Sequence, residues 1–296
     1  MSLEEILSHY KTILIALEKA SDIQLHSSQP NQIIQHSTKK DGSVITEIDL
    51  LSEQIILDAI KKSFPHDSIH SEEQGFFEPN HSENKKRIWF VDPLDGTASF
   101  LEGLPHFGPT LALVEDDKII FAALFLPKIN ERWVVIPKFG VYSLISKGNE
   151  HFQAIKHIDP KRLTRSSQGL NHRSVLYVPS QFHLFAQTKW PGKIRSLGSL
   201  SAHLFYTAIG RSDCVIVPSR WQEWDVAAGF SALFAEQRYL FQPSLHPDSK
   251  HSSGSFSRVS DLFSSINTKK SLPVIFGNKH AVQFFTTPSS IKLLNI

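Results

Sequence analysis

A short stretch of this chain, IWFVDPLDG at positions 88–96, constrains its fold and chemistry more than any other part of the sequence. The stretch begins with four apolar residues, a run typical of a buried strand. Pro93 cannot donate a backbone hydrogen bond, so strand pairing is expected to stop there and the chain to turn. Asp92 and Asp95 lie on either side of that proline and are therefore expected to point into the same space.

The residues that follow suggest an anion site beside these two acids. Gly96 allows close backbone approach, and Thr97 is a suitable cap for a following helix, whose free amide groups attract an anion. Carboxylates repel an anion unless a cation lies between them, and Mg²⁺ binds carboxylates, water and substrate oxygens together. An ordinary strand-end turn is an equal alternative for this stretch alone, because Asp, Pro and Gly are common turn residues.

Composition limits the partners that such a site serves. The 296 residues are 41% hydrophobic, enough for one large domain or two close halves. Thirty-one basic and 29 acidic residues give a charge of +2, so nothing favours nucleic acid or an anionic membrane, and a small molecule is the expected partner. Cys214 is the one cysteine and fits a reducing compartment. With no secretion signal and no apolar run of about 20 residues, a cytoplasmic protein is expected.

The hydrophobic pattern predicts a mixed α/β fold, with an α+β N-terminal half over 1–145 and an α/β C-terminal half over 146–296. Helical spacing covers 3–20 and 47–63, and strand patterns cover 87–92 and 110–135. In the second half, short apolar runs at 173–179, 213–218 and 272–277 predict strands, separated by helices over 180–189, 199–210 and 225–236. The Ser- and His-rich segment 246–257 is expected to be an exposed loop, whose role stays open.

Further acidic residues favour a cation site over a simple turn. Glu72 and Glu73 occur in IHSEEQG, Asp41 and Asp49 in DGSVITEID, and Asp225 in EWDVAAG. Each alone has an ordinary interpretation as solvated charge or as an acid at a helix N-terminus. Lys39, just ahead of DGS, would lie near the acids, although an isolated surface lysine is the favoured interpretation. Together, the several acids make the ordinary interpretations less convincing.

Taken together, these segments resemble the inositol monophosphatase family, the lithium-sensitive, Mg²⁺-dependent phosphatases. A paired Glu, then DPLDGT, then WDVAAG follow in the family's order, with DGSVITEID upstream and GSLSAHLFYTAIGRSD between, over about residues 38–236. The resemblance implies a layered αβαβα sandwich and an enzyme, a phosphoric monoester hydrolase acting on a small phosphate ester. Family members are commonly dimers, which allows a homodimer here.

The resemblance also implies roles for the matched positions. Those that would hold two or three Mg²⁺ ions are Glu72, Glu73, Asp92, Leu94 through its carbonyl, Asp95 and Asp225. The catalytic positions would be Glu72 and Thr97, which take a proton from a metal-bound water, and Asp49, which orients Thr97. The amides of Gly96 and Thr97 would bind phosphate oxygens, and Ser199, Arg220 and Glu223 would complete the substrate site.

One departure from the family pattern leaves the substrate open. Pro218 stands where the inositol enzymes carry an acid that contacts the inositol hydroxyls. Arg220, Trp221 and Glu223 instead offer a cation, an aromatic face and an acid, suited to a second phosphate or a planar ring. Histidinol-phosphate phosphatase and 3'(2'),5'-bisphosphate nucleotidase are therefore alternatives, and an inactive regulatory homologue that binds metal or phosphate is the alternative from another class.

Overall fold

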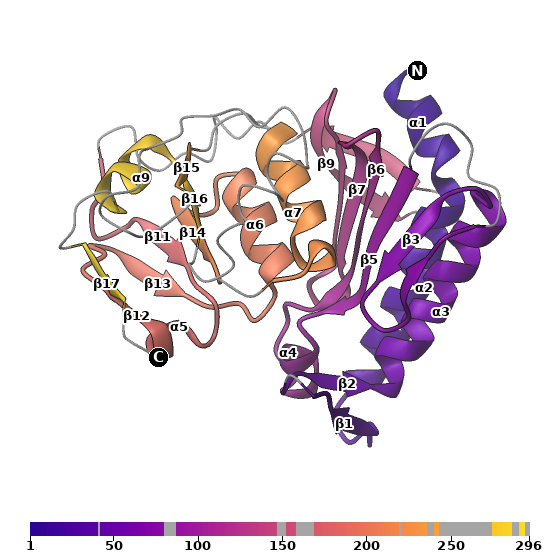
Figure 1. Ribbon diagram of the computed structural model, residues 1–296, viewed down its shortest axis with the longest axis horizontal. Coiled ribbons are helices and arrows are strands. Elements are labelled where there is room, and N and C mark those ends of the chain that lie inside the picture. Colours follow the sequence, from indigo (N-terminus) through magenta and orange to yellow (C-terminus); the bar gives the residue numbers. More distant parts are fainter. Residues whose placement is uncertain are drawn as a thin grey trace.

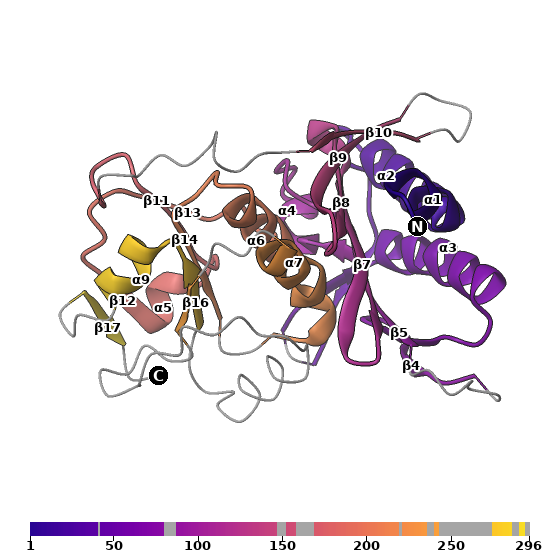
Figure 2. The ribbon, with the colours of Figure 1, turned by 90° about the horizontal axis from the view of Figure 1, so that it is seen from above.

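Helices and two main sheets alternate in five layers (Figure 1), which confirms the expected mixed α/β sandwich. The computed structural model describes residues 1–40, 42–79, 87–146, 152–157, 169–218, 221–235, 240–242, 274–285 and 290–293. Seen from above in Figure 2, α6 and α7 lie between the two sheets, while α2 and α3 cover the far face of the first sheet. No helix in these described ranges is both long and apolar enough to cross a membrane.

The outer layer consists of three helices from the start of the chain. They are α1 (Leu3–His9), α2 (Lys11–Ser27) and α3 (Glu47–Ser63). A small hairpin of β1 (His36–Thr38) and β2 (Val44–Thr46) separates α2 from α3. Leu17 and Ile56 of these helices pack on Trp89 and Phe121 of the first sheet, and this core fixes α3 against the strand that carries Asp92.

The first sheet has eight strands in the order β10-β9-β8-β7-β6-β5-β3-β4. Their bounds are β3 (Ser68–Ser71), β4 (Gly75–Phe77), β5 (Arg87–Asp95), β6 (Gly108–Glu115), β7 (Lys118–Leu126), β8 (Glu131–Ile136), β9 (Gly140–Ser146) and β10 (Phe152–His157). Only β3 and β5 pair in parallel among these described strands. Because β10 pairs with β9, the sheet continues past residue 145, and the proposed division into halves stays a prediction.

The middle layer and second sheet come from the rest of the chain. The helices are α6 (Leu200–Ala208) and α7 (Glu223–Ala235), and the sheet has the order β13-β11-β14-β16-β15. Its strands are β11 (Val175–Tyr177), β13 (Lys193–Arg195), β14 (Cys214–Val217), β15 (Leu240–Gln242) and β16 (Val274–Gly277). A methyl group on Gly229 would lie 2.4 Å from Leu204 Cβ, so this glycine lets α7 approach α6 closely.

The outermost layer differs from the sequence prediction. The helix expected over 180–189 is wrong: α5 (Phe182–Phe185) is followed by strand β12 (Ala186–Thr188). This strand pairs with β17 (Ile291–Leu293), a partner about a hundred residues away that local periodicity cannot reveal. Helix α9 (Lys279–Phe285) also covers this face.

Candidate active site

A bulge in β5 brings Asp92 and Asp95 to one side of the sheet. Asp92 pairs with Thr110 and Asp95 with Gly108, so β5 has one more residue than β6 at this point. Side chains three positions apart normally point to opposite faces of a strand, and one extra residue reverses that relation. The expectation that pairing stops at Pro93 is therefore wrong, because β5 continues to Asp95 around the proline.

Asp92 is the centre of the acidic cluster. It is 3% exposed, and its Oδ1 accepts a hydrogen bond from Leu94 N at 2.9 Å. Burial raises the pKa of Asp92 well above its usual value, and the carboxylates of Glu72, Asp95 and Asp225 raise it further. The structure therefore brings together four of the predicted metal ligands, from the turn after β3, from β5 and from α7.

The predicted glutamate pair lies in the turn after β3. The amide of Glu72 bonds to Val91 O at 3.1 Å, which continues the parallel pairing of β3 with β5. Lys39 Nζ lies 2.7 Å from Glu72 Oε1 and 2.7 Å from Glu73 Oε1, so the interpretation of Lys39 as an isolated surface lysine is wrong. Burial lowers the pKa of Lys39, but its bonds to both carboxylates outweigh burial and raise it. Burial raises the pKa of Glu73 to about 7.

Asp49 and Thr97, predicted as partners, are in contact. Asp49 lies in the first turn of α3 and is fully buried. Thr97 Oγ1 lies 2.9 Å from Asp49 Oδ1 and 3.1 Å from Leu94 O, and its single hydrogen can be donated to either oxygen. Thr46 caps α3 and donates its amide to Asp49 Oδ2 at 2.8 Å, which holds the carboxylate in place. Burial raises the pKa of Asp49.

The backbone conformation at position 96, next to Thr97, requires a glycine. Its φ of 89° lies in the left-handed region, and a Cβ there would lie 2.9 Å from His106 O and 3.1 Å from Gly198 O. Gly96 is also the N-cap of α4 (Thr97–Leu101), a position that the sequence reasoning gave to Thr97.

The N-terminus of α6 binds Asp95. Ser199 Oγ donates to Asp95 Oδ2 at 2.6 Å, Ser201 N donates to the same oxygen at 2.8 Å, and Leu200 N donates to Oδ1 at 3.3 Å. Burial raises the pKa of Asp95 to about 6, and the bond from Ser199 opposes that rise. Ser199, predicted to contact substrate, thus holds a predicted metal ligand instead of facing open space.

Asp225 enters from the first turn of α7. Its Oδ2 accepts from Gln222 N at 2.7 Å, and its backbone carbonyl accepts from Ser201 Oγ at 3.1 Å. Burial raises its pKa to about 8, with contributions from the charges of Glu72, Asp95 and Glu223. Glu223 is therefore close enough to act on the cluster. Of the other named residues, Trp221 packs edge-on against Phe230 with ring centroids 5.9 Å apart, whereas Asp41, Arg220 and segment 246–257 lie outside the described residues.

The donor set suits a hard cation, although it is not closed around one. Buried carboxylates that raise one another's pKa form a site of excess negative charge, and their oxygens are the ligands that Mg²⁺ prefers. Within the described ranges, no three His, Cys, Asp or Glu side chains form a group that could hold an ion as they lie. The carboxylates are instead engaged by Lys39, by the N-terminus of α6 and by Gln222.

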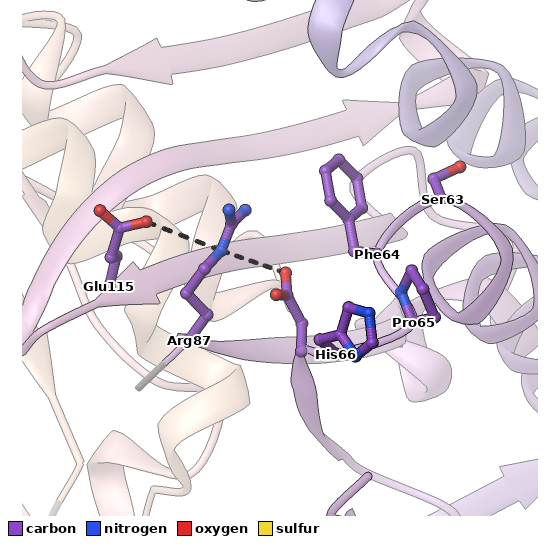
Figure 3. Close-up of a pocket in the computed structure, with 7 residues that line it drawn as sticks. Ser63, Phe64, Pro65, His66, Arg87 and Glu115 are labelled. Carbon is purple, nitrogen blue, oxygen red and sulfur yellow. Dashed lines mark ion pairs between the residues drawn. The ribbon is translucent and has the colours of Figure 1, made fainter. Parts of the chain in front are cut away.

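A separate cavity lies at the opposite end of β5 (Figure 3). It has a volume of about 250 Å³ and is lined by Ser63, Phe64, Pro65, His66, Asp67, Arg87 and Glu115. Arg87 Nε lies 3.2 Å from Asp67 Oδ2 and 3.7 Å from Glu115 Oε2, so its charge is balanced within the protein. Because Arg87 begins β5 and the acids end it, this cavity is not part of the acidic cluster.

Comparisons with known proteins show which family and which fold this chain resembles. The model of the inositol monophosphatase family matches residues 6–235. A protein called Nus factor SuhB from Pasteurella multocida is 28% identical over 215 residues, which are 72% of this chain and 77% of that protein. A fructose-1,6-bisphosphatase/inositol-1-monophosphatase from Thermotoga maritima is 31% identical over 193 residues, or 64% of this chain and 69% of the relative.

Solved structures show the same fold. The extragenic suppressor protein suhB from Bartonella henselae superposes with a TM-score of 0.67 at 21% identity, covering 94% of this chain and 96% of that chain. An IMPase from Thermotoga maritima gives a TM-score of 0.65 at 23% identity, covering 93% and 94%.

Proposed function

Because this chain belongs to the inositol monophosphatase family, we propose that it is a Mg²⁺-dependent phosphomonoesterase acting on a small phosphate ester. The observation that supports this most is the environment of Asp92, a buried carboxylate that three other carboxylates act upon. A fold gains no stability from gathering like charges, whereas a divalent cation turns the same arrangement into a binding site.

The residues that would hold the ions are Glu72, Glu73, Asp92, Leu94, Asp95 and Asp225. When bound there, Mg²⁺ supplies a water of lowered pKa and neutralises charge on the phosphate. Lys39 must then leave Glu72, since its ammonium group lies 2.7 Å from that carboxylate. Asp225 can keep the bond from the amide of Gln222 to its Oδ2, because its second carboxylate oxygen would be left for an ion.

The protein's own side chains would move the proton of the attacking water. If Thr97 donates its single hydroxyl hydrogen to the buried Asp49, a lone pair of its oxygen is left to accept a hydrogen bond from that water and so orient it. Glu72 is the nearby carboxylate that would take the proton. The amides of Gly96 and Thr97 would orient the phosphate for in-line attack.

A regulatory protein without turnover is the alternative from another class. The name of the relatives called Nus factor SuhB describes a factor and mentions no substrate. The presence of every predicted metal acid, together with the Asp49–Thr97 pair, favours the enzyme, because a protein that only binds a partner has no need of a cluster of buried acids.

We further propose a substrate with a ring or a second anionic group, such as histidinol phosphate or a nucleoside 3'(2'),5'-bisphosphate. The side chain of Pro218 offers no acceptor for an inositol hydroxyl. A lost hydrogen bond to a charged group is worth about 1.5–3 kcal/mol, or about 10- to 100-fold in affinity. Glu223, close to Asp225, and Arg220 supply charges that a ring nitrogen or a second phosphate would use.

A side-by-side measurement of kcat/KM tests this proposal. The panel contains histidinol phosphate, adenosine 3',5'-bisphosphate, fructose 1,6-bisphosphate and inositol 1-phosphate, each with Mg²⁺. We expect one of the first three to exceed inositol 1-phosphate, and Arg220→Ala to narrow the gap. Inositol 1-phosphate as the best substrate would contradict the proposed pocket alone. A folded protein that releases no phosphate from any of them would favour the regulatory alternative.

A further inference from the structure

One face of α3 carries three fully buried polar residues, Asp49, Ser52 and Glu53. Their spacing, three and four positions apart, places them together on the side of the helix that faces the sheet. A buried polar group is unfavourable unless it is hydrogen-bonded. The partners of these side chains therefore indicate what the face is for.

Glu53 binds the turn that carries the glutamate pair. Its Oε1 accepts from Glu73 N at 3.0 Å and from Gln74 N at 3.2 Å. The preceding amide, that of Glu72, is already bonded to Val91 O. Three successive amides of this turn are therefore hydrogen-bonded, that of Glu72 to β5 and those of Glu73 and Gln74 to Glu53. These bonds restrict movement of the backbone that carries both glutamates.

The same face also supports the turn between Asp92 and Asp95. Gln24 Nε2 donates to Ser52 Oγ at 3.0 Å and to Pro93 O at 2.8 Å, and Gln24 is itself fully buried. The segments that carry Glu72 and Asp92 are therefore both linked to α3, the first directly by Glu53 and the second through Gln24 of α2.

A contribution to stability does not explain why a glutamate is buried at position 53. Burying a carboxylate is expensive, and apolar residues of similar volume are often as stable or more so in such positions. One oxygen, Oε2, is buried without a hydrogen-bond partner in the described part of the chain. The group is thus better suited to fixing backbone amides than to filling the core.

We propose that Glu53 is a positioning residue that holds the 72–74 turn so that Glu72 faces Asp92 in a geometry that binds a divalent ion. This inference rests on the proposed function for its catalytic consequence, but the contact itself can be tested in the metal-free protein. Glu53 is not one of the residues proposed to hold an ion, and it acts through the backbone of Glu73 and Gln74.

The test compares Glu53→Leu and Glu53→Gln with Leu57→Ala, a control on the same helix that opens a cavity in the α2–α3 core away from the site. Hydrogen exchange in the metal-free proteins reports the amides of Glu73 and Gln74. We expect Glu53→Leu to speed their exchange at least about 10-fold, because both amides lose their acceptor. Glu53→Gln keeps a carbonyl oxygen there and should retain most of the protection.

The second readout is Mg²⁺ dependence, measured both as a thermal shift and as phosphatase rate. Glu53→Leu should raise the Mg²⁺ concentration for half of either effect at least about 10-fold and lower kcat more than it changes KM. Unchanged protection of both amides in Glu53→Leu, or equal effects in Leu57→Ala, would overturn the inference. A wild-type protein with no Mg²⁺ response contradicts the proposed function, whereas a normal wild-type response with an unaltered Glu53→Leu variant contradicts the role of Glu53.

Discussion

Removing the hydroxyl of Ser199 should weaken the link between strand β5 of the first sheet and helix α6. Its Oγ donates to Asp95 Oδ2 at 2.6 Å and accepts from Ala202 N at 3.0 Å as the N-cap of α6. Ser199→Ala deletes both bonds at a position that is fully buried, where water cannot replace them.

The size of the effect follows from these two bonds. Loss of a Ser cap costs about 1 kcal/mol, and loss of a hydrogen bond to a charged group costs about 1.5–3 kcal/mol. Asp95 keeps the amides of Ser201 and Leu200, so we expect a total near the lower end, about 2–3 kcal/mol. The pKa of Asp95 should also rise above about 6, because the deleted bond favours the charged form.

Urea unfolding in the presence of a chelator measures this loss without a contribution from bound ions. Thr110→Val is the control, since its fully buried hydroxyl donates to the backbone carbonyl of Ala123 at 3.1 Å, and its loss should cost about 1 kcal/mol. A double-mutant cycle with Asp95→Asn isolates the Ser199–Asp95 term. A loss below about 0.5 kcal/mol in Ser199→Ala, or an additive cycle, would refute this reasoning.

Three further results are expected. Asp92→Asn should lower kcat by about 100-fold or more. It should leave Tm equal or higher, because repulsion among the acids is relieved. A variant that largely fails to fold would instead favour a purely structural role for Asp92. In chelator, the raised pKa values of Asp95 (about 6) and Asp225 (about 8) mean that the folded protein binds more protons than the unfolded chain between about pH 4 and pH 8. The free energy of unfolding should therefore be lower at pH 8 than at pH 5, which urea unfolding at the two pH values would measure. A higher free energy of unfolding at pH 8 would contradict the pKa shifts. Lys39→Gln should lower the Mg²⁺ concentration needed for half-maximal activity, because its ammonium group competes for Glu72; an unchanged or higher requirement would show that Lys39 does not compete.

Local patterns predicted much of this fold. Helical spacing predicted α3 at its observed bounds, and short apolar runs predicted β11, β14 and β16. These elements have one buried face or are buried throughout. The spacing of their apolar side chains in the sequence is therefore enough to predict them. The acids were found for a similar reason, since Asp92, Asp95 and Asp225 end or begin buried elements, and a buried carboxylate needs a partner.

The missed features depend on contacts between distant segments. The bulge in β5 is defined only by its pairing with β6, and β12 exists only because β17 lies beside it. Lys39 and Ser199 have ordinary surroundings in sequence, and the carboxylates that they bind are brought to them by the fold. For Glu53 a signal was present, because Asp49, Ser52 and Glu53 form a polar stripe on a helix whose neighbouring residues are apolar.

The most direct measurement is phosphate release as a function of Mg²⁺ concentration, with the best ester of the panel and with a chelator control. If the carboxylates around Asp92 bind the ions that drive hydrolysis, release should require Mg²⁺, saturate with it and disappear in excess chelator, and Asp225→Asn should shift the saturation to higher concentration. Release that persists after exhaustive chelation would contradict a metal-dependent site at these acids.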